Sequence, residues 1–202
     1  PKLVAEVQAV LDAVADALAT ALADVRVGDP ADESTQMGAL VGTTQREEVR
    51  GAVMSLRSAT DVVVDTCTFH DVDPSVGAFL APTVLRATDP TARSIHATEA
   101  FGPVCTLIGY DGPDEAIRLA ALGAGSLVAS VVTPDVDEAA TLTLGIAAHH
   151  GRVHVLDAST AATSTGHGSP LPTLVHGGPG RAGGGEEMGG LRGIRHHMQT
   201  SA

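Results

Sequence analysis

Leu127-Val128-Ala129-Ser130-Val131-Val132 is apolar without alternation and lies in a strand expected over residues 126–132; it indicates the fold class of this 202-residue chain. Such a run is typical of a strand in a parallel sheet that is covered on both faces. A helical pattern over residues 134–149 follows it, and a further strand is expected over residues 152–157. A strand, a helix and a strand in this order predict a βαβ unit. We therefore expect an α/β fold, a mostly parallel sheet with flanking helices.

The same alternation extends toward the N-terminus. A strand is expected over residues 104–108 and a helix over residues 114–122. Another helix is expected near the start of the chain, and Gly28-Asp29-Pro30 ends this helix. Its apolar residues recur at steps of three and four, and they are Leu3, Val7, Val10, Val14, Leu18, Leu22 and Val25. Because Pro1 lies within this pattern and is not Met, we expect the chain to be the later part of a longer protein.

Thr44-Gln45-Arg46-Glu47 has the spacing of a capping box, in which two side chains satisfy the first amides of a helix. It predicts a second helix, whose apolar face is formed by Val49, Ala52, Val53 and Leu56. A short strand is expected over residues 61–65. The N-terminal half of the chain is thus expected to contain two helices before the regular alternation begins.

Acidic residues dominate the charge of the chain. Twelve Lys and Arg against 24 Asp and Glu give a formal net charge of −12, with an isoelectric point of about 5.0. Because nucleic-acid affinity depends on Lys and Arg that neutralise phosphates, we expect no nucleic-acid partner. No apolar run reaches the roughly 20 residues that span a bilayer, so no membrane contact is expected. Two cysteines are too few for a disulfide framework, and they fit a reducing, cytoplasmic location.

Glycine is enriched near the C-terminus. Eleven of the 23 glycines fall between Gly166 and Gly193. Consecutive backbone amides without side chains can surround a phosphate, although no Gly-Lys-Ser/Thr sequence of a Walker loop follows. The same composition fits a flexible surface loop equally well. Composition leaves both interpretations open, and Arg181 within the tract makes a featureless linker the weaker of the two.

The cysteines and histidines do not form a recognisable reactive site. Cys105 lies in an apolar run, which predicts a buried and inert thiol. Cys67 has four aspartates nearby, which are expected to raise its pKa. His149 and His150 are interpreted as favourable charges at a helix C-terminus rather than as ligands, and His154 lies beyond Gly151 in a strand. Neither an activated cysteine nor a metal site is therefore expected.

Short motifs along the chain follow one family pattern in order and spacing. They are Val27-Gly28-Asp29-Pro30, Gln36-Met37-Gly38-Ala39-Leu40, Gln45-Arg46, Ala81-Pro82-Thr83-Val84-Leu85 and Glu99-Ala100-Phe101-Gly102-Pro103-Val104. Together they resemble the aldehyde dehydrogenase superfamily over essentially the whole chain. In that superfamily a cysteine thiolate attacks the aldehyde, a hydride passes to nicotinamide, and a glutamate activates the water that releases the acid.

The C-terminal part is similar to one branch of that superfamily. Residues 164–172 and 176–187 stand where ordinary members have a P-x-GG-x-K-x-S-G loop. They resemble the dehydrogenase half of bifunctional enzymes of phenylacetate degradation, which join a ring-opening hydratase to oxidation of the resulting CoA-linked semialdehyde. The resemblance implies a fragment of an NAD- or NADP-dependent aldehyde dehydrogenase that oxidises such a semialdehyde to the acid. It also implies a homo-oligomer and leaves room for a fused hydratase domain.

The resemblance also implies where the functional residues lie. Residues 1–202 would form one partial domain, the catalytic thiol domain after the nucleophile segment, incomplete at its N-terminus. Glu99 would accept hydrogen bonds from the nicotinamide ribose, and Phe101 would pack near the nicotinamide. His167 and Arg181 would bind the substrate, in an entrance loop over residues 160–193. The family's nucleophile and base have no counterpart here, so we expect the 202 residues alone neither to oxidise aldehydes nor to bind the cofactor appreciably.

A rival hypothesis is a non-enzymatic structural or oligomerisation module derived from this fold. Apolar strands in an incomplete sheet would leave edges and faces that need a partner. The DNA upstream of the Pro1 codon distinguishes the two hypotheses. An open reading frame that contains a GQxC segment supports an enzyme, whereas a start site there supports the module.

Overall fold

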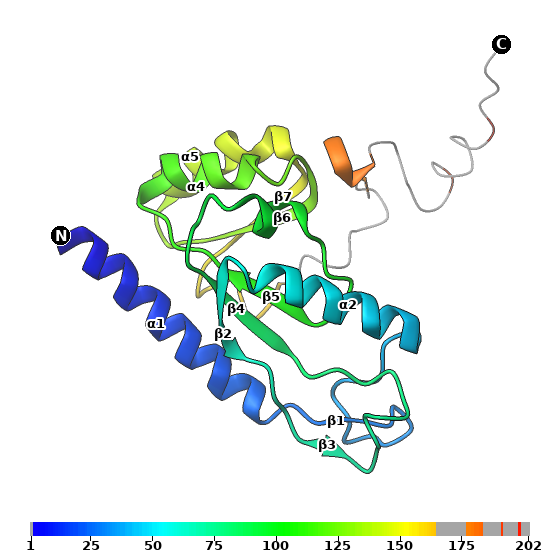
Figure 1. Cartoon of the computed structure of the whole chain (residues 1–202). Coiled ribbons are helices and arrows are strands. Elements are labelled where there is room, and N and C mark those ends of the chain that lie inside the picture. Colours follow the sequence, from blue (N-terminus) through cyan, green and yellow to red (C-terminus); the bar gives the residue numbers. More distant parts are fainter. Residues whose placement is uncertain (1, 165–176, 184–190, 192–197, 199–202) are drawn as a thin grey trace. The chain divides into compact units, whose positions relative to one another are not determined.

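The computed structural model describes residues 2–164 and 177–183, together with Leu191 and Met198 (Figure 1). The chain divides into two compact units, Pro1–Asp111 and Gly112–Ala202. Within the described residues, no helix is both long enough and apolar enough to cross a membrane. The expected α/β class is confirmed in both units, because helices and strands occur in each of them.

The first unit combines helices with a small mixed sheet. In the part of the chain that the structure describes, its elements are α1 Lys2–Ala23, β1 Val27–Gly28, α2 Thr43–Leu56, β2 Thr60–Val64, β3 Phe69–His70, β4 Thr83–Ala87, α3 Arg93–Ala97 and β5 Val104–Leu107. The order in the three-stranded sheet is β2-β4-β5. β4 is antiparallel to β2 and parallel to β5, while β1 and β3 form a separate parallel pair.

β4 is the central strand of the first unit and contributes most to its core. Val84 and Leu85 are almost completely buried, and Val49 of α2 and Val27 of β1 are buried to the same degree. The motif Ala81-Pro82-Thr83-Val84-Leu85 therefore leads directly into a core strand. No strand was expected over these residues. Burial of these four aliphatic side chains stabilises the first unit, because it removes apolar surface from water.

The long N-terminal helix is confirmed, but its apolar stripe is only partly buried. α1 ends at Ala23, and an ion pair of 2.6 Å joins Asp12 of α1 to Arg86 of β4. Ala15 is buried, whereas Val10 and Val14, which belong to the expected stripe, are exposed. The buried face is thus rotated relative to the one predicted from valines and leucines alone.

The start of α2 differs from the expected capping box. The N-cap is Gly42, which has no side chain to accept a capping hydrogen bond, and Thr44 lies inside the first turn. Thr44 therefore does not cap the helix, and the prediction is wrong. Instead, the Gln45 side-chain oxygen accepts a hydrogen bond of 3.1 Å from the Val41 amide. The Gln45 side chain, at the third helical position, thus satisfies the amide one residue before the N-cap, whereas a capping box satisfies the amide of the N-cap itself.

The second unit contains the predicted βαβ arrangement. In its described part the elements are α4 Gly112–Ala121, β6 Ser126–Val132, α5 Val136–Ile146, the 3₁₀ turn η1 Ala147–His149, β7 His150–Leu156 and the 3₁₀ turn η2 Gly180–Ala182. β6 and β7 are parallel, with Val128 opposite Arg152. α5 packs against α4 and on both strands (Figure 1). The strand-helix-strand prediction is confirmed, with β7 starting two residues earlier than expected.

One prediction about the second sheet is wrong for the described residues. Val132 is 73% exposed, and Leu127 and Val155 are also exposed. Burial along β6 is therefore uneven, and the sheet is not covered on both faces by the part of the chain that the structure describes. Val and Leu occur on both faces of the strand, and this pattern predicts burial on both faces.

Removal of the α5 cap is expected to destabilise the second unit measurably. The Asp135 carboxylate accepts hydrogen bonds from the amides of Asp137 (2.9 Å) and Glu138 (3.1 Å). Asp135→Ala should cost about 1 kcal/mol because it leaves these two amides without a side-chain acceptor. Asp137→Ala, which removes only a charge from the first turn, should cost about 0.3 kcal/mol. Thermal unfolding by circular dichroism measures both, and equal shifts would contradict the capping role.

Candidate cofactor-contacting site

Residues 99–104 form a tight loop between α3 and β5. The Gly102 amide donates to the Ala100 carbonyl, and the Val104 amide donates to the Gly102 carbonyl, both at 2.8 Å. The Pro103 carbonyl accepts a further bond of 2.8 Å from the Thr83 amide at the start of β4. These bonds join the loop to the central strand, so its backbone has a fixed position in the first unit.

Helix α2 supports the same loop from another side. The Gln45 side-chain nitrogen donates to the Phe101 carbonyl at 2.6 Å, while the Gln45 oxygen holds the Val41 amide. A methyl group on Gly102 would lie 2.9 Å from both terminal carbons of Val49, closer than side chains normally approach. Only glycine therefore lets the loop lie this close to the helix. The Gln45-Arg46 motif and the Glu99–Val104 motif are thus in direct contact.

The two residues expected to contact the cofactor both lie on the surface of this loop. Phe101 is 69% exposed although its carbonyl is held by Gln45, and Glu99 is also exposed. A fixed backbone with an outward aromatic ring and an outward carboxylate can present both groups to a ligand. A carboxylate accepts hydrogen bonds from ribose hydroxyls, and an apolar ring restricts the orientation of a planar heterocycle that packs against it. The residues present therefore fit a nicotinamide nucleoside.

Arg46 has a role that sequence reasoning missed. It is 9% exposed, and its Nη1 donates to the Pro74 carbonyl at 2.9 Å and to the Gly77 carbonyl. Its Nε pairs with Glu47 at 3.0 Å. Arg46 therefore fixes the segment that precedes β4. The sequence did contain an indication of this role. Arg46 lies three positions before Val49, which places it on the buried face of the helix.

The described part of the glycine tract holds a defined turn. Gly178 and Gly183 form a bridge around the turn η2, and the Arg181 amide donates to the Ala124 carbonyl at 3.0 Å. Residues 177–183 thus form a turn that backbone hydrogen bonds hold. The Arg181 side chain is exposed. His167 lies outside the described residues, so its expected role in substrate binding stays a prediction.

Neither cysteine has the surroundings of a nucleophile. Cys105 is exposed, contrary to the expected burial, because β5 lies at the edge of the three-stranded sheet. Partial desolvation raises the pKa of the Cys105 thiol and also that of Cys67. The direction predicted for Cys67 is correct, although desolvation and not the nearby carboxylates causes it. A raised pKa reduces the thiolate fraction at neutral pH, so both thiols are poor nucleophiles.

The late histidines make backbone and hydroxyl contacts. The Nδ1 of His150 lies 2.9 Å from the Ile146 carbonyl oxygen, at the end of the α5–η1 segment, as a helix C-terminal histidine would. The Nε2 of His154 lies 3.5 Å from the Ser164 hydroxyl. Among the described residues, no three His, Cys, Asp or Glu side chains gather in a way that would hold a metal ion.

Comparison with known proteins gives relatives over most of the chain. Residues 3–202 match the model of the aldehyde dehydrogenase family. The chain is 48% identical over 169 residues to protein MaoC of Klebsiella aerogenes, which covers 82% of this chain and 49% of MaoC. It is 41% identical over 161 residues to 3,4-dehydroadipyl-CoA semialdehyde dehydrogenase of Aromatoleum evansii, which covers 78% of this chain and 31% of that enzyme. The chain thus spans half or less of the length of these relatives.

Solved structures agree with the sequence comparison. An aldehyde dehydrogenase C mutant from Pseudomonas syringae, in complex with NAD+ and octanal, is 27% identical and superposes with a TM-score of 0.75. The match covers 92% of this chain and 36% of that one. The resemblance that the motifs indicated is confirmed by the family model, the relatives and the fold. The chain belongs to the aldehyde dehydrogenase family.

Proposed function

We propose that this chain is part of an enzyme that oxidises a CoA-linked semialdehyde to the acid with NAD+ or NADP+, in aerobic phenylacetate degradation. The observation that carries the proposal is the 41% identity to 3,4-dehydroadipyl-CoA semialdehyde dehydrogenase. The exposed Glu99 and Phe101, held on a fixed loop, support it. The departure of residues 164–187 from the ordinary family loop supports a CoA-linked substrate rather than a free aldehyde.

The described residues would contribute cofactor orientation rather than bond making. When bound, the nicotinamide supplies the hydride acceptor for aldehyde oxidation. Glu99 would accept hydrogen bonds from ribose hydroxyls, and Phe101 would restrict the nicotinamide orientation. Gln45 keeps Phe101 in place through its carbonyl. Because the pKa values of Cys67 and Cys105 are raised, we propose that the attacking thiolate belongs to the enzyme outside these residues. The chain would then be the catalytic-domain portion that follows the nucleophile.

NAD(P)H formation by the full-length protein tests the proposed function. The wild type should oxidise 3,4-dehydroadipyl-CoA semialdehyde with a kcat/KM about 100-fold above that for octanal. Only the CoA ester carries a CoA group that can bind the enzyme away from the reacting aldehyde. Glu99→Gln should raise the KM for the cofactor about tenfold, since a carboxylate accepts stronger hydrogen bonds than an amide. Glu48→Gln, on the exposed side of α2, should leave it unchanged. Equal rates with both aldehydes, or none with either, would contradict the proposal.

Arg181 is proposed to bind a phosphate of CoA at the substrate entrance, and His167 is proposed to bind the substrate as well. Its amide is held by Ala124 while its side chain is exposed. Arg181→Ala in the full-length enzyme should raise the KM for the CoA-linked aldehyde about tenfold and leave that for octanal unchanged. Steady-state kinetics with both aldehydes decides this. An equal effect on both substrates would remove Arg181 from the CoA site.

The rival function, a structural module that assembles with copies of itself, is favoured by the exposed apolar residues of β6 and β7. Val132 and Leu127 are the clearest examples. This alternative predicts an oligomer that forms no NAD(P)H with any aldehyde. Light scattering combined with the activity measurement separates it from the enzyme, which is proposed to be a homo-oligomer that is active.

A further inference from the structure

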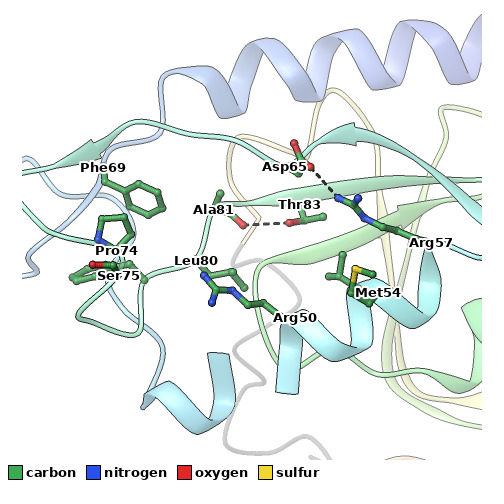
Figure 2. A pocket seen from close by; sticks show the side chains of 12 residues that line it. Arg50, Met54, Arg57, Asp65, Phe69, Pro74, Ser75, Leu80, Ala81 and Thr83 are labelled. Carbon is green, nitrogen blue, oxygen red and sulfur yellow. Dashed lines mark hydrogen bonds and ion pairs between the residues drawn. The ribbon is translucent and has the colours of Figure 1, made fainter. Parts of the chain in front are cut away.

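A pocket of about 660 Å³ opens in the first unit between the second half of α2 and residues 65–83 (Figure 2). Its volume lies in the range of roughly 300–1,000 Å³ that small-molecule sites occupy. None of its lining residues belongs to the cofactor or substrate contacts proposed above. The pocket is therefore separate from those contacts, and its lining residues define which ligand chemistry would fit it.

The floor of the pocket is apolar and partly aromatic. Phe69 and Phe79 line it with Leu80, and Met54 and Val53 contribute from α2. The chain has only three Phe, so two of them gather in this one place. Aromatic and sulfur-containing side chains pack well around an apolar body and adapt to its shape. The floor thus suits a hydrocarbon or an aromatic ring.

The charged part of the pocket lies on one face of α2. Arg50 and Arg57 are seven residues apart, which places them on the same face of the helix, and both line the pocket. Figure 2 shows the Arg50 guanidinium beside Leu80 and the Arg57 guanidinium paired with Asp65. Positive charge and apolar surface therefore meet inside one cavity.

The ion pairs around these arginines leave an excess of positive charge. Arg57 pairs with Asp65 at 3.0 Å, and Arg50 pairs with Glu47 at 2.9 Å. Glu47 also pairs with Arg46 at 3.0 Å. Among the lining residues, two guanidinium groups accompany one carboxylate, that of Asp65, which leaves one positive charge in the lining, in a chain whose net charge is −12. In the described part of the chain, Arg50 uses only Nη1 in these pairs, and a guanidinium has five N–H donors.

We propose that this pocket binds a small organic monoanion, an apolar body that ends in a carboxylate. The body would lie on Phe69, Met54 and Leu80, and the carboxylate would accept from Arg50. One excess positive charge matches a carboxylate, whereas a phosphate dianion would call for more. The site goes beyond the proposed dehydrogenase function and does not depend on it.

Titration of the full-length protein with 4-phenylbutyrate tests this site. Isothermal calorimetry should give a Kd of about 1 mM, as expected for a dozen heavy atoms in a shallow pocket. The neutral 4-phenylbutanol and the short anion acetate should each bind at least about tenfold more weakly, because each lacks one half of the recognition. In protein labelled with ¹³C at the methionine methyl groups, the Met54 signal, assigned with Met54→Leu, should shift in a saturable manner.

Two variants connect the binding to the pocket. Arg50→Gln should weaken 4-phenylbutyrate about tenfold, since it removes a charge-assisted hydrogen bond. Arg93→Gln, at an exposed arginine of α3 outside the lining, is the matched control and should change nothing. Met54→Glu, at an exposed helix position, adds a negative charge at the pocket and should weaken binding by a similar factor.

Three results would overturn the proposal. They are the absence of a saturable Met54 shift up to roughly 10 mM ligand, equal affinity of the alcohol and the carboxylate, and equal effects of Arg50→Gln and Arg93→Gln. Because Arg50, Arg93 and Met54 are all exposed on helices, the variants keep helix-forming side chains in solvent. A missing effect would therefore count against the site and not against folding.

Discussion

Replacing Arg46 with methionine is expected to destabilise the chain by about 3 kcal/mol, which corresponds to a fall in Tm of roughly 9 °C. Arg46 is buried and donates through Nη1 to the carbonyl groups of Pro74 and Gly77. Methionine keeps the apolar stem but leaves both carbonyl oxygens without a donor. The charge-assisted bonds lost here are about twice as strong as neutral ones. Thermal unfolding followed by circular dichroism measures the effect.

The matched control lies one turn further along the same helix. Arg50 is exposed and pairs with Glu47 on the surface of α2, so Arg50→Met should cost less than about 0.5 kcal/mol. Hydrogen exchange gives a local readout, because the Leu40 amide donates to the Ala78 carbonyl in the segment that Arg46 holds. In Arg46→Met the Leu40 amide should exchange faster than in Arg50→Met. Identical melting and identical exchange in the two variants would show that Arg46 does not anchor this segment.

The sequence predicted the elements whose pattern is local. β6, α5 and β7 follow one another in the chain, and each shows its own hydrophobic pattern, so the βαβ unit could be predicted. β4 could not, because its place between β2 and β5 depends on pairing with strands that are distant in sequence. Its five residues follow a proline and are too few to show a period. Pairing across the chain, which local patterns do not encode, therefore decided the core of the first unit.

The candidate site was predicted for a different reason. Glu99 and Phe101 were identified by a family motif, and nothing in their own chemistry distinguished them. The contacts that hold this loop and the segment before β4 were missed because they join distant residues. Gln45 reaches the Phe101 carbonyl across 56 residues, and Arg46 reaches Gly77 across 31. The assignment of Cys105 as buried failed because an apolar run does not reveal that its strand lies at a sheet edge.

Replacing Gly178 with alanine is expected to detach the described glycine turn from β6. The added methyl group would overlap the Ser126 carbonyl oxygen and lie 2.9 Å from the Ala182 side chain. Because the first neighbour is backbone at the start of β6, the turn has to move away. The second unit should lose about 3 kcal/mol, the upper range for inserting a methyl group into a packed site. Gly123→Ala, whose methyl would lie 3.5 Å from the Ala120 carbonyl oxygen, an ordinary van der Waals distance, should leave stability within about 0.5 kcal/mol.

The same substitution tests whether the turn positions Arg181 for substrate binding. If the turn positions Arg181 through the bond from its amide to Ala124, Gly178→Ala should raise the KM for the CoA-linked aldehyde as much as Arg181→Ala does, about tenfold. The double variant should then be no worse than either single variant, because both remove one shared interaction. Independent effects would multiply to about 100-fold. Steady-state kinetics of the three full-length variants distinguishes these outcomes. A tenfold rise in the double variant supports positioning by the turn, whereas a 100-fold rise means that Arg181 binds the substrate without it.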